Sequence, residues 1–157
     1  MSELTISPAE AHEAAGCIAS TLRAWHNRVG FLPRKEAGWR RYTFADLISI
    51  RLMVILTSRG MTAAGAASII RTIADEIEAA SQGVSSLITV GKVGPAGEWV
   101  AESIDPSISV RSAFDFDDEA PFVLNLRSIA TKLFLAICRI RGAEPFSGPI
   151  LIVKDET

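Results

Sequence analysis

The chain has 157 residues, of which 48% are hydrophobic and 22% are charged. This length suits one compact domain or a small domain with an appendage, and the composition supports a packed core and argues against global disorder. No apolar stretch reaches the roughly 18–20 residues of a membrane-spanning helix, and the start lacks the basic and then apolar pattern of a signal peptide. We therefore expect no membrane partner and a cytoplasmic location.

The net charge of −2 conceals an uneven distribution along the chain. Residues 1–73 hold nine lysines and arginines against five acidic residues, a balance of +4. Residues 74–157 hold seven lysines and arginines against thirteen acidic residues, a balance of −6. A basic front half favours a polyanionic partner such as nucleic acid. The acidic second half is not expected to bind nucleic acid by itself.

Metal and catalytic signals are weak. Cys17 and Cys138 form no CxxC pair and, with His12 and His26, no clustered ligand set, so we expect no metal and two reduced, partly buried thiols. The chain lacks a nucleophile motif beside its histidines and a GxxxxGK[ST] phosphate loop. The acidic group at 115–119 is interpreted as a solvated loop rather than a calcium site. We expect no enzyme activity and no cofactor.

Two short helices separated by a glycine are predicted near the start of the chain. Ser7 and Pro8 suit the N-cap and first position of a helix that ends at Gly16. A second helix is expected from about residue 19 to 27. The candidates for inward contacts are Ala15, Leu22 and Trp25. This order of elements is the outline of a helix-turn-helix.

The following segment, residues 29–42, is rich in glycine and proline and is predicted to form a β-hairpin or wing. It ends in Gly38-Trp39-Arg40-Arg41-Tyr42, with two arginines between two large aromatic residues. Gly38 permits a turn, and Arg40 and Arg41 point to opposite faces if the segment is extended. Only one arginine would then face DNA directly. The alternative interpretation is a charged surface loop with both aromatic residues as core anchors.

Two more helices and a mixed region complete the chain. Thr43 and Asp46 predict a capped, buried helix that ends at Gly60, and Thr62 predicts the start of another that reaches about Ala80. Residues 84–112 contain β-branched runs around a Gly-Pro-Ala-Gly turn, which predicts two or three strands. A helix is predicted over about 122–141, and a short strand or tail ends the chain.

The predicted fold is mainly α with small β elements. Residues 1–80 are expected to form a winged helix-turn-helix, and residues 81–157 an α+β region for dimerisation or for binding an effector or partner. One apolar stripe of the last helix approximates the 3.5-residue seam of a dimer contact. It comprises Leu126, Ile129, Leu133, Ile137 and Ile140. The alternative is that this helix packs on the 84–112 strands within one protomer, and both could hold on different faces.

Polar and basic residues of the front half form the candidate DNA-binding set. Ser20 and Thr21 lie at the start of the second helix, where side chains reach base edges or phosphates. Arginine suits phosphate because its planar fork donates two parallel hydrogen bonds. The other members are Arg23 and Arg28 of the helix and Arg34, Lys35, Arg40, Arg41 and Tyr42 of the wing.

These motifs, in this order, resemble the DNA-binding domain of the MerR family of transcription regulators over about residues 5–75. The resemblance implies that Arg23 enters the major groove and that Arg40 and Tyr42 touch backbone phosphate. It also implies a homodimer on a pseudo-palindromic operator of double-stranded DNA, with RNA polymerase or an unknown effector as further candidate partners. The matching pieces are Thr21-Leu22-Arg23-Ala24-Trp25, Gly30-Phe31-Leu32-Pro33-Arg34, Gly38-Trp39-Arg40-Arg41-Tyr42, Asp46-Leu47 and Gly60-Met61-Thr62.

The chain departs from the family pattern at several points. Ile18 stands where a serine or threonine usually caps the recognition helix, Ala24 replaces an aromatic residue, and Leu32 directly precedes Pro33. No cysteine motif follows the front half, so metal sensing is not carried over. Two alternatives stay open: an architectural, excisionase-like DNA-binding factor, and a ligand- or protein-binding module that uses the 84–112 strands with Trp99.

Overall fold

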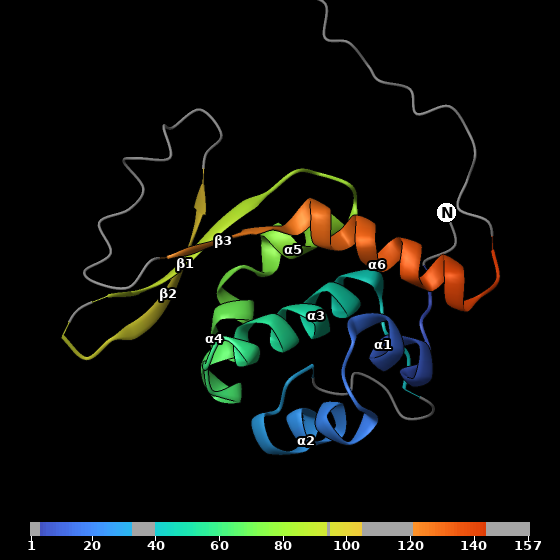
Figure 1. The fold of residues 1–157 in the computed structure, drawn as a ribbon, viewed down its shortest axis with the longest axis horizontal. Coiled ribbons are helices and arrows are strands. Elements are labelled where there is room, and N and C mark those ends of the chain that lie inside the picture. Colours follow the sequence, from blue (N-terminus) through green and yellow to red (C-terminus); the bar gives the residue numbers. More distant parts are fainter. Residues whose placement is uncertain (1–3, 33–39, 94, 105–120, 144–157) are drawn as a thin grey trace, which may run out of the picture.

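The computed structural model describes residues 4–32, 40–93, 95–104 and 121–143, and in these ranges the chain forms a helical body with a small antiparallel sheet (Figure 1). Figure 1 shows α3 in the middle of the body, with α6 along one side and α2 on the other. The helices are α1 (Pro8–Ala15), α2 (Ala19–Val29), α3 (Phe44–Ser58), α4 (Ala63–Thr72), α5 (Ala74–Ser81) and α6 (Leu126–Ile140), and the strands are β1 (Leu87–Val93), β2 (Glu98–Ile104) and β3 (Phe122–Asn125). The predicted fold class, mainly α with small β elements, is confirmed.

Helix α1 begins and ends where the sequence predicts. The hydroxyl of Ser7 accepts a hydrogen bond from the Glu10 backbone N–H over 3.3 Å, and Oε2 of Glu10 accepts one from the Ser7 N–H over 2.8 Å. Each bond occupies a backbone N–H that the helix itself leaves unpaired. Gly16 ends the helix in the left-handed conformation, with φ of 72°. The chain therefore turns at once toward α2.

Helix α3 forms the centre of the core. The same reciprocal capping fixes its start, because the Thr43 hydroxyl accepts from the Asp46 N–H over 3.1 Å and Asp46 Oδ2 accepts from the Thr43 N–H over 2.9 Å. Its buried side chains point in several directions, which is typical of a helix covered on most sides. They are Leu47, Ile48, Ser49, Ile50, Leu52, Met53 and Leu56.

The helix predicted from Thr62 to about Ala80 is in fact two helices. Helix α4 ends at Thr72, Ile73 takes a φ of −105° and a ψ of 27°, and α5 begins at Ala74. Both helices pack on α3, and α5 also packs on α6. The bend lets Ile70 of α4 and Ile77 of α5 both reach the core. Tertiary packing therefore interrupts a segment whose local pattern is continuous.

The helix predicted over about 122–141 begins four residues later than expected. Phe122, Val123 and Leu124 belong to β3, whose backbone pairs with β1 in antiparallel register. Asn125 then caps α6, since its side-chain oxygen accepts from the Ser128 N–H over 2.9 Å. The aromatic and β-branched residues of this segment suit a strand. Pairing with the edge of β1 makes the segment a strand instead of the first turn of the helix.

The sheet has the strand order β2-β1-β3, with antiparallel neighbours throughout. Strands β1 and β2 lie inside the range 84–112 in which strands were expected, and residues 105–120 lie outside the described residues. Ile88, Val90 and Leu124 are buried in the main hydrophobic core. Figure 1 shows the sheet extending away from the helices at the α4 and α5 end of the body.

Helix α6 packs inside the protomer. It lies mainly against α1, α3 and α5, and its buried residues share one hydrophobic cluster with Ile88 and Val90 of β1. Of the five residues predicted to form a dimer seam, Leu126, Leu133 and Ile137 are buried in the protomer's own core. Ile129 and Ile140 are partly buried against the same core. The inward stripe of α6 is therefore occupied by the protomer's own core.

One hydrophobic cluster joins the parts of the chain on either side of the predicted boundary at residue 80. It contains Ile6, Leu22 and Leu47 from the front part and Ile88 and Leu133 from the second part. Buried Ala15, Leu22 and Trp25 occupy the inward positions expected of them. No helix within the described ranges is long and apolar enough to cross a membrane.

Candidate nucleic-acid interface

Helix α2 presents a polar, basic face to the outside. Leu22 and Trp25 anchor the helix, with 4% and 9% of their surface exposed. Ser20, Arg23 and Arg28 are exposed, and Thr21 is half-buried. Residues 19–29 contain no acidic side chain, so nothing on the helix itself opposes an approaching polyanion.

The turn between α1 and α2 is fixed by a contact from α3. Nη1 of Arg51 donates to the Ala15 carbonyl over 3.0 Å, which occupies an acceptor that the end of α1 leaves unpaired. Gly16 lies directly beside this guanidinium, since a Cβ atom at Gly16 would stand 3.1 Å from Nη1. The angle between α1 and α2 therefore depends on a close approach that glycine permits.

The end of α2 joins a stack of rings. Phe31 packs edge-on against Trp25, with ring centroids 6.5 Å apart. The imidazole of His26 stacks between the rings of Phe31 and Tyr42, at 6.2 and 5.9 Å between centroids. Tyr42 is held in turn by backbone pairing with Ile6, through two hydrogen bonds of 2.9 Å. The last residue of the predicted wing is thus fastened to both α2 and the start of the chain.

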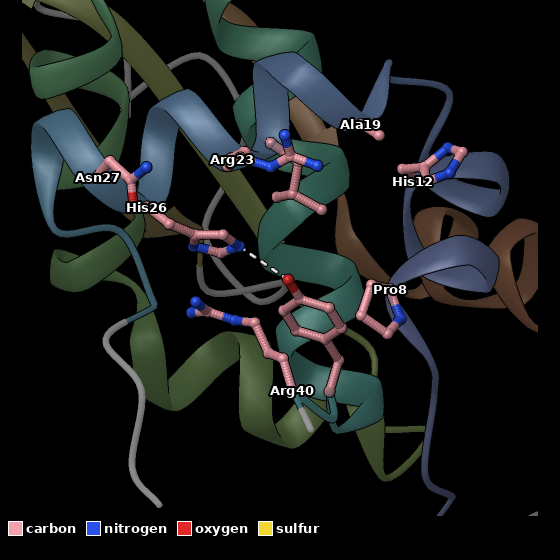
Figure 2. A pocket seen from close by; sticks show the side chains of 9 residues that line it. Pro8, His12, Ala19, Arg23, His26, Asn27 and Arg40 are labelled. Carbon is pink, nitrogen blue, oxygen red and sulfur yellow. Dashed lines mark hydrogen bonds between the residues drawn. The ribbon is translucent and has the colours of Figure 1, made fainter. Parts of the chain in front are cut away.

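A pocket of about 200 Å³ opens between the start of α1, the outer face of α2 and residues 40–42. Figure 2 shows Arg23 and Arg40 on opposite sides of this pocket, with His26 beside Arg40 and His12 at the far end. Its lining comprises Pro8, His12, Ala19, Leu22, Arg23, His26, Asn27, Arg40 and Tyr42. None of these residues is acidic, so the pocket is suited to an anion.

His26 is held by a hydrogen bond at each ring nitrogen. Nδ1 lies 2.6 Å from the Phe31 carbonyl oxygen, and Nε2 lies 2.8 Å from the Tyr42 hydroxyl, the bond drawn as a dashed line in Figure 2. Burial lowers the pKa of His26, assisted by the nearby charge of Arg40 and opposed by the Phe31 carbonyl and by Asp46. The imidazole is therefore neutral at neutral pH. Burial likewise raises the pKa of Tyr42, which keeps its hydroxyl protonated.

The two neighbouring arginines have different surroundings. The half-buried guanidinium of Arg40 donates from Nη2 to the Leu32 carbonyl and lies 5.4 Å from the centroid of the Tyr42 ring. Arg41 is exposed. The two side chains therefore differ as the alternation of an extended segment predicts. Arg34 and Lys35 lie outside the described residues.

Residues 6–73 match the family model described as the MerR HTH family regulatory protein. These residues form a MerR-like helix-turn-helix domain. The MerR-like domain spans α1 to α4 and ends at Ile73, where α4 gives way to α5. Domains of this family bind DNA and regulate transcription. A search of curated proteins finds no match to the chain.

Within the MerR-like domain, the structure brings Arg23, Arg40 and Tyr42 to one pocket and leaves Ser20, Arg28 and Arg41 outside its lining. It also adds His26 and Asn27, which the sequence did not nominate. Their spacing from Arg23 is three and four residues, which places all three on one side of a helix. That spacing is the signal that could have identified them.

The two cysteines are partly buried, as the sequence predicts. Cys17 and Cys138 are free, half-buried thiols, and burial raises the pKa of Cys17. Across the described residues, no group of three or more histidine, cysteine, aspartate or glutamate side chains is placed to hold a metal ion.

Proposed function

We propose that the chain is a sequence-specific DNA-binding regulator of transcription that acts as a homodimer on an operator. The observation that carries this proposal is the face of α2, where Ser20, Arg23 and Arg28 are exposed while Leu22 and Trp25 anchor the helix. That face belongs to a MerR-like helix-turn-helix domain. The role requires no catalysis and no cofactor, and it places the protein with the DNA, in the cytoplasm.

In the proposed complex, α2 enters the major groove. Arg23 lies in the outer part of the helix, and its guanidinium can donate two parallel hydrogen bonds to the O6 and N7 atoms of guanine. Ser20 and Thr21 stand at the helix start, where short hydroxyl side chains reach base edges or phosphates. Arg28 lies in the last turn and serves as a contact to the backbone.

The wing residues supply contacts that do not depend on base sequence. Arg40 uses one guanidinium nitrogen for the Leu32 carbonyl, which fixes its orientation and leaves other N–H groups to donate to a phosphate. Arg41 is exposed beside it. We propose phosphate contacts for both, and Arg34 and Lys35 stay proposals from the sequence. Each such contact would make binding weaken as the salt concentration rises.

For the homodimer, the structure favours the outer face of α6 over its inner stripe. Leu126, Leu133 and Ile137 are already buried within the protomer. Phe134 and Leu135 are 43% and 42% exposed, although large apolar side chains are usually buried. We propose that these two residues meet the partner subunit.

The arginine assignments are tested by titrating a labelled duplex with the full chain at several salt concentrations. Arg23→Ala should reduce the preference for one sequence over another by about 1–3 kcal/mol. Arg40→Ala should weaken binding to all sequences and lower the salt slope by about one. Arg71→Ala, which removes an exposed arginine of α4 outside the proposed DNA-binding and dimer surfaces, is the matched control and should bind as the wild type does. Unchanged binding by both front-half variants would show that α2 and the wing do not contact DNA.

A further inference from the structure

The Tyr42 side chain presents a problem for direct phosphate binding. Its surface is 3% exposed, and its hydroxyl oxygen reaches the pocket only beside His26 Nε2, 2.8 Å away. A phosphate oxygen can only accept hydrogen bonds, so the hydroxyl must donate to it. Tyrosine has one such hydrogen to give. Whether the hydroxyl can donate this hydrogen to a phosphate depends on the protonation state of His26.

The geometry determines the tautomer of the neutral imidazole. A carbonyl oxygen only accepts, so Nδ1, at 2.6 Å from the Phe31 carbonyl, must carry the ring hydrogen. Nε2 then holds a lone pair and accepts the hydrogen of the Tyr42 hydroxyl. In this state the hydroxyl turns its hydrogen inward and offers only lone pairs to the pocket. These lone pairs repel a phosphate oxygen.

We propose that uptake of a proton by His26 converts the Tyr42 hydroxyl into a donor to a DNA backbone phosphate in this pocket. The proton binds at Nε2, and the new N–H donates to the Tyr42 oxygen. The hydroxyl hydrogen is released from Nε2 and can rotate toward the pocket. No covalent bond to carbon changes, and the charge of the pair rises by one.

Charged groups from every neighbouring element act on this step. The charge of Arg40 disfavours a proton on His26, while Arg23 of α2 and His12 of α1 also line the pocket. Asp46 of α3 favours the protonated ring. A bound phosphate would offset the positive charge of the arginines, and the surrounding charges would then favour a proton on His26. Protonation and phosphate binding therefore favour each other, and the coupling is equal in both directions.

This inference rests on the proposed function, since it names a DNA phosphate as the ligand. The consequence is a DNA affinity that increases as the pH falls toward the range in which His26 takes up a proton. One linked proton increases an affinity by at most about tenfold per pH unit. Between pH 7.5 and pH 5.5 we expect roughly a three- to tenfold gain that depends on His26.

The test is fluorescence anisotropy of a labelled mixed-sequence duplex of roughly 20 base pairs, about two helical turns, at constant ionic strength. Because phosphate contacts are independent of sequence, no operator is needed. His26→Gln should remove the His26-dependent gain, and Tyr42→Phe should weaken binding more at pH 5.5 than at pH 7.5. His12→Gln, which removes the other imidazole that lines the pocket, should keep the part of the gain that depends on His26.

A second readout uses the unmodified protein, so it does not depend on whether the variants fold. Titration of the His26 ring by NMR should show a pKa that rises when the duplex is added. An unchanged His26 pKa, or an equal pH dependence in wild type and His26→Gln, would overturn the inference and leave DNA binding intact. Failure of the wild type to bind the duplex at any of these pH values would overturn the proposed function as well.

Discussion

Arg141, directly after α6, is bonded to Glu10 in the first turn of α1. Its Nε donates to Oε1 of Glu10 over 2.6 Å, and its Nη2 donates to the Thr5 carbonyl over 2.7 Å. Glu10 also forms the capping pair with Ser7. The hydrogen bond from Arg141, followed by those from Ser7, lowers the pKa of Glu10 from 4.5 to about 2. The last described helix is thereby tied to the helix-turn-helix that carries α2.

This contact predicts an acid dependence of stability. Because the pKa of Glu10 is lower in the folded chain than in the unfolded one, its contribution is fully present above pH 4.5 and is lost as the pH falls to about 2. Arg141→Ala should reduce the free energy of unfolding at pH 7 by about 1–2 kcal/mol, since solvent screens a partly exposed pair. Urea unfolding at several pH values between 2 and 7 measures this free energy for the wild type and the variant.

The control for this prediction is Arg139→Ala, which removes an exposed arginine from the last turn of the same helix. It should leave the acid dependence unchanged. If Arg141→Ala retained the wild-type slope between pH 2 and 4.5, the stabilisation of Glu10 would have another source.

Gly16 and Gly30 form a matched pair for testing the turn before α2. Both have positive φ, 72° and 61°, so alanine at either should cost about 1–2 kcal/mol. At Gly16 the added Cβ would also displace the Arg51 guanidinium from the Ala15 carbonyl, whereas at Gly30 no described atom lies within 4 Å. Thermal unfolding should show Gly16→Ala to be the more damaging by about 1 kcal/mol. Equal losses would contradict the role given to Arg51.

Ile18 leaves the recognition helix without a side-chain cap. It is the N-cap residue of α2 and is 68% exposed, so its side chain adds little burial. Ile18→Ser would supply a hydroxyl that can accept from an N–H of the first turn and should stabilise the chain by about 1 kcal/mol relative to Ile18→Ala. Chemical denaturation of the two variants measures the difference. Equal stability would mean that these N–H groups are already satisfied.

The face of α6 that a partner would use is tested at Leu135. This residue is exposed on the helix, and Leu133 beside it is buried. Leu135→Arg should convert a dimer into a monomer in analytical ultracentrifugation, and the monomer should remain folded because Leu135 lies outside the protomer core. Leu133→Ala should instead lower the stability of the protomer by about 2–5 kcal/mol. A Leu135→Arg protein that remained dimeric would move the dimer contact away from this face.

Local signals predicted local structure well. The capping pairs at Ser7 and Thr43, and the glycine that ends α1, depend on residues within three or four positions of one another. The strand Phe122–Asn125 could not be predicted in the same way, because it depends on pairing with Leu87–Val90, more than thirty positions away. The bend at Ile73 has a similar origin in the packing of α4 and α5 on α3.

The candidate site shows the same limit. The exposure of Arg23 and Arg28 on α2 follows from helical spacing, and the two anchors Leu22 and Trp25 were identified with it. The hydrogen bond between His26 and Tyr42 joins residues sixteen positions apart, across a segment with no regular pattern. Sequence reasoning therefore nominated Tyr42 for phosphate contact without the histidine that holds its hydroxyl hydrogen.

Selection of genomic DNA fragments by the full chain, followed by sequencing, tests sequence-specific binding most directly. Wild-type protein should enrich a recurrent motif with two-fold symmetry, as a homodimer with one α2 in each half-site requires. Arg23→Ala should bind DNA with a reduced preference for that motif, and Arg71→Ala should retain the preference. Recovery of fragments with no shared motif by the wild-type protein would contradict a sequence-specific regulator.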